Sequence, residues 1–257
     1  IDDPNRVSEL VARAFSVAVS GRPGPVVVAL PEDMLREMTT TPAANAVPTL
    51  AAQASTAQID AIAVELNAAK RPVMMCGGGG WTDQGRDDLL AFAEAANIPV
   101  ICGFRNQDLM DTTSHAYVGD AAFGKPAAMQ DLIAQSDCIL AINIRFGEVV
   151  TDGWQMFEFP VVARLRSAAI EGDWASYCAD ARAAYLETRV VPKTLGSLNL
   201  ARVCNYLNEH ADADAIYTNG AGNYAIWSGK YLNYSKHHRL LAPQAGAMGA
   251  GIPAAIA

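Results

Sequence analysis

The sequence lacks an excess of positive charge. Its 257 residues include 19 Lys and Arg against 27 Asp and Glu, which gives a formal net charge of -8 at pH 7. Because proteins bind nucleic-acid phosphates through clustered Lys and Arg, we expect no nucleic-acid partner. The densest basic stretch, residues 236–239, is short, and we interpret it as a solvated face.

A long apolar run is also missing. No stretch reaches the length of about 18 apolar residues that crosses a bilayer, and the first residues lack the pattern of a secretory signal. The apolar stretch 245–255 is short and contains three glycines, so we interpret it as a helix start packed against a ligand. We therefore expect a soluble protein that makes no membrane contact.

Paired cysteines and clusters of metal ligands are absent as well. The five cysteines are odd in number and widely spaced, with no C-x-x-C pair, which predicts a reduced, cytoplasmic protein. His237 and His238 are adjacent and poorly placed to share a metal, while His115 and His210 have no nearby ligand partner. The sequence therefore predicts no metal ligands in this chain.

An alternation of apolar runs and helical patterns is what the sequence does contain. Residues 72–76 form a short apolar run, four glycines follow at 77–80, and a helical pattern spans 87–96. A strand, a glycine turn and a helix are typical of the first half of a βαβ unit. The glycines either let a ligand approach the backbone or permit tight strand–helix packing, and the G-x-G-x-x-G spacing is absent.

Two further apolar runs, residues 100–102 and 139–142, predict interior strands of the same sheet, while 117–120 is interpreted as a loop. The predicted fold class is α/β, with a Rossmann-like parallel sheet flanked by helices and with partial α/β domains on either side. A buried strand is expected at 26–30 and a further strand at 215–218. Helical spacing predicts further helices at residues 7–20, 58–69, 127–135, 174–186 and 198–209.

Three segments together resemble the thiamine-diphosphate-dependent enzymes of the acetolactate-synthase-like group. The segments are residues 21–33, then 71–160 with the motifs at 105–109 and 144–148, and finally 219–223 with 246–255. The resemblance implies four parts of the chain. These are the tail of a pyrimidine-binding domain at 1–38, a linker at 39–57, a central Rossmann-like domain at 58–185, and the truncated start of a diphosphate-binding domain at 186–257.

The same resemblance implies the site residues. Ala221, Gly222 and Asn223 match positions at the cofactor diphosphate, and backbone N–H groups between a strand and a helix suit an anion. Gly246 matches the residue whose carbonyl accepts a hydrogen bond from the aminopyrimidine. Met248 matches the catalytic wedge that bends the cofactor, and its alternative interpretation is core filling.

The sequence also departs from the family pattern. The resemblance implies that the catalytic glutamate would lie before Ile1 and that the Mg²⁺ ligands would lie beyond Ala257. Only residues 161–173 stand where the family has a strand and a helix, which indicates missing residues at that junction. Arg145 and Phe146 are followed by Gly147 and Glu148 rather than two aspartates, so FAD is the less favoured cofactor.

The resemblance implies an enzyme that decarboxylates or ligates 2-oxo acids with thiamine diphosphate and Mg²⁺. It also implies a homodimer or homotetramer, because the family's active site forms between subunits. Two alternatives stay open: a nucleotide-binding or regulatory module built on the glycines at 77–80, and an inactive homologue or fragment without its catalytic glutamate and metal motif.

Overall fold

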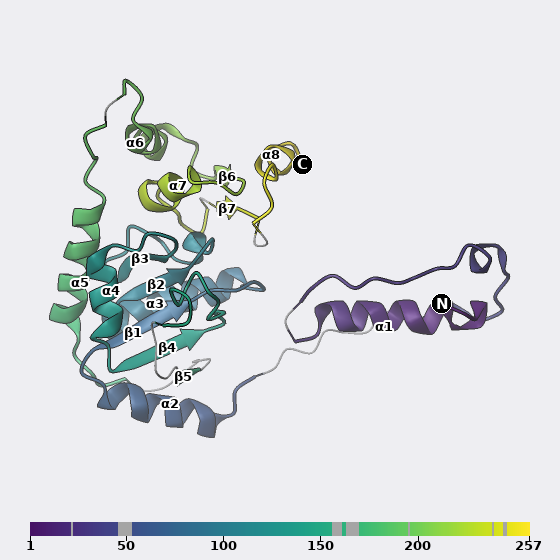
Figure 1. The fold of residues 1–257 in the computed structure, drawn as a ribbon. Helices are drawn as coiled ribbons and strands as arrows, with labels where there is room; N and C mark the ends of the chain where they lie inside the picture. The colour runs from purple at the N-terminus through teal and green to yellow at the C-terminus, as the bar shows by residue number, and fades with distance from the viewer. Residues whose placement is uncertain are drawn as a thin grey trace. The chain divides into compact units, whose positions relative to one another are not determined.

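The computed structural model divides the chain into two compact units, Ile1–Gln53 and Ala54–Ala257. The four-part division expected from the sequence places its boundaries elsewhere and stays a prediction. Figure 1 shows the ribbon of the chain. The structure describes residues 1–21, 23–45, 53–155, 170–194, 196–237, 239–243 and 246–257, and the backbone of 161–162.

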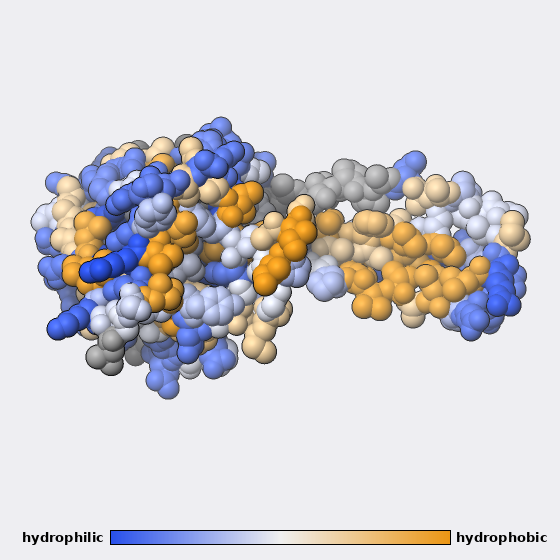
Figure 2. Space-filling view, turned by 90° about the horizontal axis from the view of Figure 1, so that it is seen from above, coloured by the Kyte–Doolittle hydropathy of each residue, from blue (hydrophilic) through white to orange (hydrophobic). Residues whose placement is uncertain are grey.

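The first unit contains one long helix and no core among its described residues. Helix α1 (Val7–Val19) confirms the helix predicted at 7–20, and two 3-10 turns, η1 (Pro4–Arg6) and η2 (Met34–Arg36), accompany it. None of the unit's described residues is buried, and Phe15 is 70% exposed. Figure 2 shows apolar side chains gathered on the surface of this helix.

The strand predicted at 26–30 is wrong. These residues have no strand pairing and are mostly exposed, with Val27 at 91%. An apolar β-branched run becomes a strand only when a neighbouring strand takes up its backbone groups, and the described part of this unit offers none. The linker predicted at 39–57 has no regular structure over 39–45 and 53–55, helix α2 already covers its last two residues, and 46–52 lie outside the described residues.

The second unit is organised around a parallel sheet. Its strand order is β3-β2-β1-β4-β5, and every neighbouring pair is parallel. This confirms the predicted Rossmann-like α/β fold and the three predicted interior strands. The strands are β1 (Pro72–Cys76), β2 (Val100–Gly103), β3 (Tyr117–Ala121), β4 (Cys138–Ile142) and the two-residue β5 (Val161–Val162).

Helices cover both faces of this sheet, as the burial of β1 shows. All five residues of β1 are buried, and because alternate side chains point to opposite faces, neither face meets solvent there. Helix α2 contacts β4, while α5 contacts both β3 and α4 (Figure 1). The helices are α2 (Thr56–Ala68), α3 (Asp83–Ala96), α4 (Ala127–Ala134) and α5 (Ala175–Thr188).

The loop predicted at 117–120 is wrong, because these residues form β3 beside β2. Gly119 explains the error. Its φ of +117° is a conformation that L side chains rarely adopt, and the register between β2 and β3 shifts nearby. Gly119 and the following Asp120 look like turn residues in the sequence, although the buried Tyr117 and Val118 hold the segment in the sheet.

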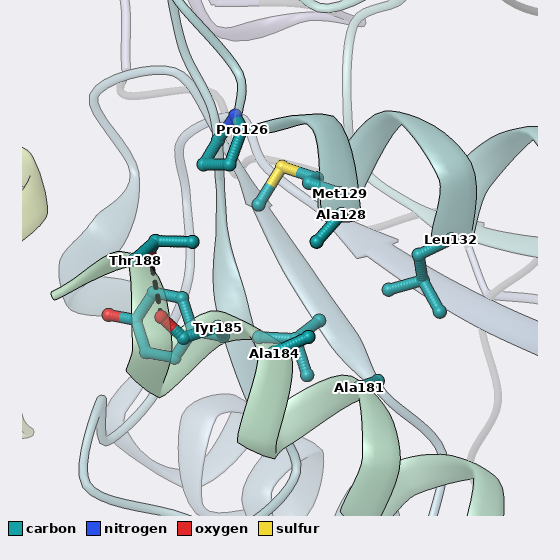
Figure 3. A pocket seen from close by; sticks show the side chains of 9 residues that line it. Pro126, Ala128, Met129, Leu132, Ala181, Ala184, Tyr185 and Thr188 are labelled. Atoms are coloured by element: carbon teal, nitrogen blue, oxygen red, sulfur yellow. Dashed lines mark hydrogen bonds between the residues drawn. The ribbon is translucent and has the colours of Figure 1, made fainter.

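Helices α4 and α5 pack closely, as Figure 3 shows from nearby. Met129 and Leu132 of α4 face Ala184 and Tyr185 of α5 across an apolar cavity of about 20 Å³. The hydroxyl of Thr188 donates to the carbonyl of Tyr185 at 2.7 Å, so the polar group at the rim is satisfied within its own helix. A cavity of this size holds about one water, so this crevice is a packing gap and not a ligand site.

The C-terminal part of the second unit has a smaller core and a two-stranded parallel sheet. The strands are β6 (Ile216–Thr218) and β7 (Arg239–Leu241), and the sequence predicted only the first. The cluster beside them contains Cys204, Tyr231 and Tyr234. Its helices are α6 (Leu200–His210), α7 (Ala225–Tyr231), which the sequence did not predict, and α8 (Gly251–Ile256).

The five cysteines are free and are used as apolar side chains. Cys76 lies in β1, Cys102 in β2 and Cys138 in β4. Burial raises the pKa of the Cys76 and Cys102 thiols well above the usual value, and it raises that of Cys178 to about 11. These thiols are therefore protonated at neutral pH and poor nucleophiles.

Asp120, which is half-buried on β3, generates a stability prediction. Desolvation raises its pKa from 3.8 to about 6, although Gln107 Nε2 donates to Oδ2 at 2.8 Å. Between about pH 4 and pH 6 the unfolded chain releases a proton that the folded chain retains, so stability falls as pH rises through this window. Asp120→Asn should therefore raise the free energy of unfolding above pH 6 by on the order of 1–3 kcal/mol.

Urea unfolding at pH 5 and pH 7.5 measures this effect. The matched control is Asp131→Asn on the exposed face of α4, which should change stability little at either pH. An equal response of both variants at pH 7.5 would contradict the role of burial at Asp120.

Candidate functional site

Two loop pairs lie at the carboxyl ends of parallel strands, where α/β sheets bind ligands. In the large sheet, the glycines at 77–80 follow β1 and residues 143–147 follow β4. The strand order reverses between these two strands, which makes the place a topological switch point. In the small sheet, residues 219–224 follow β6 and residues 242–250 follow β7.

At the switch point, two asparagine side chains hold the glycine loop. Asn143 Nδ2 donates to the carbonyl of Gly79 at 2.8 Å, and Asn106 Nδ2 donates to that of Gly78 at 3.2 Å. Gly78 has a φ of +73°, and a Cβ there would overlap the carbonyl oxygen of Asn143. Gly77 and Gly78 are therefore needed for close packing between the two loops, since a Cβ on Gly77 would lie 2.9 Å from Ile144. The sequence did not predict this contact, although Asn143, directly after an apolar strand, tolerates its φ of +53° better than most residues.

At the small sheet, the structure brings the loops after β6 and β7 together. A Cβ on Gly251 would lie 2.9 Å from the carbonyl carbon of Asn219 and 3.1 Å from the nitrogen of Gly220. A Cβ on Gly220 would in turn lie 3.4 Å from the nitrogen of Gly249. Small residues are therefore required here, because two backbones approach each other closely. The two segments predicted to hold the cofactor, after β6 and after β7, thus lie side by side at one end of the small sheet.

The loop after β6 fits an anionic group. Ala221 is half-buried, while Gly222 and Asn223 are exposed. The backbone N–H groups from Gly220 to Asn223 donate no hydrogen bond to the residues that the structure describes. Within the same described part of the chain, the buried Oδ1 of Asn219 also has no hydrogen-bond partner. The unused backbone donors suit an anion, whereas the Asn219 oxygen is an acceptor and would need a donor group of the ligand.

The loop after β7 carries Gly246 and Met248. Gly246 has a φ of +74°, which favours glycine at this position. Met248 is 85% exposed, so it does not fill the core of the described residues. An exposed, flexible thioether at the loop tip is available to a ligand. The roles of Gly246 as a carbonyl acceptor and of Met248 as a wedge stay predictions.

Arg105 lies near this loop, although the sequence did not predict it as a site residue. A Cβ on Gly246 would lie 4.0 Å from its Nη1, and its guanidinium stacks 4.6 Å from the ring centroid of Phe104. Burial lowers the pKa of Arg105, and Tyr224 opposes the shift, but an arginine remains charged at neutral pH. A positive charge therefore lies beside the candidate cofactor loop. The motif at 105–109 had been noted only as part of the resemblance.

The basic stretch at 236–239 is only partly a solvated face. Lys236 pairs with Asp87 at 2.7 Å, and both side chains are well exposed. Arg239, by contrast, pairs at 2.7 Å with the buried Asp108. His238 lies outside the described residues.

Within the described ranges, no three His, Cys, Asp or Glu side chains form a group that could hold a metal ion. In the same ranges, no helix is long and apolar enough to cross a membrane.

The central part of the chain matches a known protein family. Residues 59–173 match the family model described as the central domain of thiamine pyrophosphate enzymes. This segment contains α3 and α4, nearly all of α2, and strands β1 to β5 of the large sheet. Residues 59–173 therefore belong to the central-domain family of thiamine pyrophosphate enzymes, which confirms the resemblance noted in the sequence.

Its relatives include acetolactate synthases of low identity. An acetolactate synthase of Mycobacterium bovis is 26% identical over 293 residues, covering 97% of this chain and 47% of the relative. The large subunit of acetolactate synthase isozyme 2 of Escherichia coli is 23% identical, covering 96% and 50%. The chloroplastic acetolactate synthase of Arabidopsis thaliana is 26% identical, covering 99% and 44%.

This chain spans about half the length of the relatives it matches. The alignment to the M. bovis protein extends over 293 positions, more than the 257 residues of this chain. The relative therefore carries internal residues that this chain lacks. The expected junction around 161–173 lies mostly outside the described residues, so its place as the missing segment stays a prediction.

The packing of the glycine loop generates a matched pair of variants. Gly78 and Gly80 both have a positive φ, +73° and +78°, but a Cβ on Gly80 meets nothing within 4 Å. Alanine should therefore cost about 1–2 kcal/mol of strain at either position, and an additional amount at Gly78 from overlap with Asn143. Chemical unfolding of both variants measures the difference. Equal losses would contradict the close contact between the loops.

Proposed function

We propose that the full-length protein is a thiamine-diphosphate-dependent enzyme that acts on 2-oxo acids by decarboxylation, carboligation or both. The observation that carries the proposal is the close approach of the loop after β6 to the segment after β7, where Gly251, the first residue of α8, abuts Asn219 and Gly220. It is supported by the match to the central domain of thiamine pyrophosphate enzymes and by relatives named acetolactate synthase.

In this proposal, each loop has its own task. Ala221, Gly222 and Asn223 hold the diphosphate through backbone N–H groups that donate to no described residue. Gly246 would offer its carbonyl to the aminopyrimidine, and Met248 would be the apolar wedge against which the cofactor is held. When bound, thiamine diphosphate stabilises the carbanion formed next to the substrate carbonyl.

The remaining assignments follow from the same proposal. Mg²⁺ would accompany the diphosphate, with ligands outside this chain segment, and a flavin is the less favoured additional cofactor. The assembly is a homodimer or homotetramer in the cytoplasm, with a 2-oxo acid as its small-molecule substrate. The exposed apolar face of α1 supports association, because the described residues of the first unit form no core.

A second candidate function has one specific observation in its favour. The glycine loop at 77–80 lies at the switch point of the large sheet, where nucleotides bind in related architectures. A nucleotide-binding or regulatory module would bind an adenine nucleotide and ignore thiamine diphosphate. An inactive homologue would assemble without turnover.

Calorimetric titration of the full-length protein decides among these candidates. Thiamine diphosphate with Mg²⁺ should bind, and the loaded protein should release carbon dioxide from a 2-oxo acid such as pyruvate. Adenine nucleotide binding without thiamine diphosphate binding would favour the regulatory module. Binding of thiamine diphosphate without turnover on a panel of 2-oxo acids would favour the inactive homologue.

Met248→Ala generates a sharper prediction. Because the side chain is 85% exposed, its truncation should cost well under about 1 kcal/mol of stability. Loss of the Met248 wedge should nevertheless lower turnover on the order of 100-fold, since small misplacements of reacting groups have that effect. Cofactor affinity should change little, because the diphosphate is held at Gly222 and Asn223.

The matched control is Met38→Ala, a methionine of similar exposure (86%) in the first unit. Turnover, cofactor affinity and the unfolding midpoint are measured for both variants of the full-length protein. Full turnover of Met248→Ala with normal affinity would remove Met248 from the site.

A further inference from the structure

One edge of β7 pairs with β6. Along its other edge, the described part of the chain provides a side chain as hydrogen-bond partner and no strand. Arg239 N donates to the carbonyl of Ala215, and Asn219 N donates to that of Leu241, so these groups face β6. Backbone groups alternate in direction along a strand, and the N–H of Leu240 therefore points away from β6. It donates to Oδ2 of Asp108 at 3.3 Å.

Asp108 is well suited to fix this edge. It is buried, with 5% of its surface exposed, in the 3-10 turn η3 (Gln107–Leu109) that follows β2. The same Oδ2 accepts a hydrogen bond from Nε of Arg239 at 2.7 Å. One carboxylate thus binds two successive residues of β7, and charge-assisted hydrogen bonds of this kind are shorter and stronger than neutral ones.

Neighbouring residues of the same segment contact the rest of the candidate site. Arg105 lies near Gly246, in the loop that follows β7. Gln107 lies against α7, where a Cβ on Gly229 would be 2.9 Å from its Nε2. Asp108 therefore binds β7 directly, while Arg105 lies near the loop that follows β7 and Gln107 lies close to the helix that follows the diphosphate loop.

We propose that Asp108 is a positioning residue for the candidate cofactor site. It sets the place of β7, and with it the loop carrying Gly246 and Met248, relative to the central domain. This inference rests on the proposed function. Asp108 itself touches no predicted cofactor contact, so its effect on the cofactor is transmitted through Arg239 and the backbone of Leu240.

A second ion pair supplies a control. Lys236 Nζ lies 2.7 Å from Asp87, and this pair also joins the central domain to the segment before β7. Its side chains are 40% and 46% exposed, so water screens the pair and we expect it to contribute little. Asp87→Asn therefore removes one ion pair between the same parts of the chain without touching β7.

The experiment compares Asp108→Asn with Asp87→Asn in the full-length protein. Thiamine diphosphate affinity is measured with Mg²⁺ by calorimetry, and turnover of a 2-oxo acid is measured at saturating cofactor. Asp108→Asn keeps an acceptor of similar shape but loses its charge, and it should weaken cofactor binding by at least about 10-fold. Its kcat should remain lowered at saturating cofactor, which a loss of global stability alone would not produce. Asp87→Asn should stay within about 2-fold on both measures.

Several results would overturn the inference. Wild-type affinity and kcat of folded Asp108→Asn would do so, as would equal losses in both variants. If Asp108→Asn does not fold, Arg239→Gln breaks the same ion pair from its partly exposed side. Unchanged affinity in that variant is then the contradicting result, and a several-fold loss supports the inference. If the wild-type protein does not bind thiamine diphosphate, the proposed function itself is wrong. If the wild-type protein binds it and only the effect of Asp108→Asn is missing, the proposed function stands and the role of Asp108 is wrong.

Discussion

The pairing of β1 with both β2 and β4 is the interaction on which the second unit depends. Every residue of β1 is buried, so helices cover both of its faces. The strand is also hydrogen-bonded to β2 along one edge and to β4 along the other. Three segments follow the carboxyl ends of these strands and therefore lie at the same end of the sheet. They are the glycine loop, the segment with Arg105 and Asp108, and Asn143. The contacts of the candidate cofactor loops with the central domain follow from this arrangement.

The two candidate sites use glycine for the same physical reason. At the switch point, Gly78 lets the loop after β1 approach the loop after β4, and in the small sheet Gly251 lets one backbone abut another. The sequence alone left open whether such glycines admit a ligand or only close packing. The structure shows the packing in both places, and the unused backbone donors after β6 distinguish the second place as the better candidate for an anion.

The sequence predicted the elements whose signal is local. Helices α1 to α6 follow from apolar periodicity, and β1, β2 and β4 follow from continuous apolar runs between helices. It missed β3, where Gly119 resembles a turn, and β7, whose residues gain their strand conformation from β6 and Asp108. Asp108 and Arg239 are separated by more than a hundred residues, and no spacing rule links them. The strand predicted at 26–30 failed for the opposite reason, since a local signal lacked a tertiary partner.

The segment after β2 has a consequence for thermodynamic linkage. A ligand that binds only the folded protein stabilises every element whose unfolding would destroy its site. Because Asp108 and Gln107 join the large sheet to β7 and α7, melting of the central domain would also release the loops of the small sheet. A cofactor held at the small sheet would therefore protect the amides of β1 and β2 from hydrogen exchange, although it lies against neither strand.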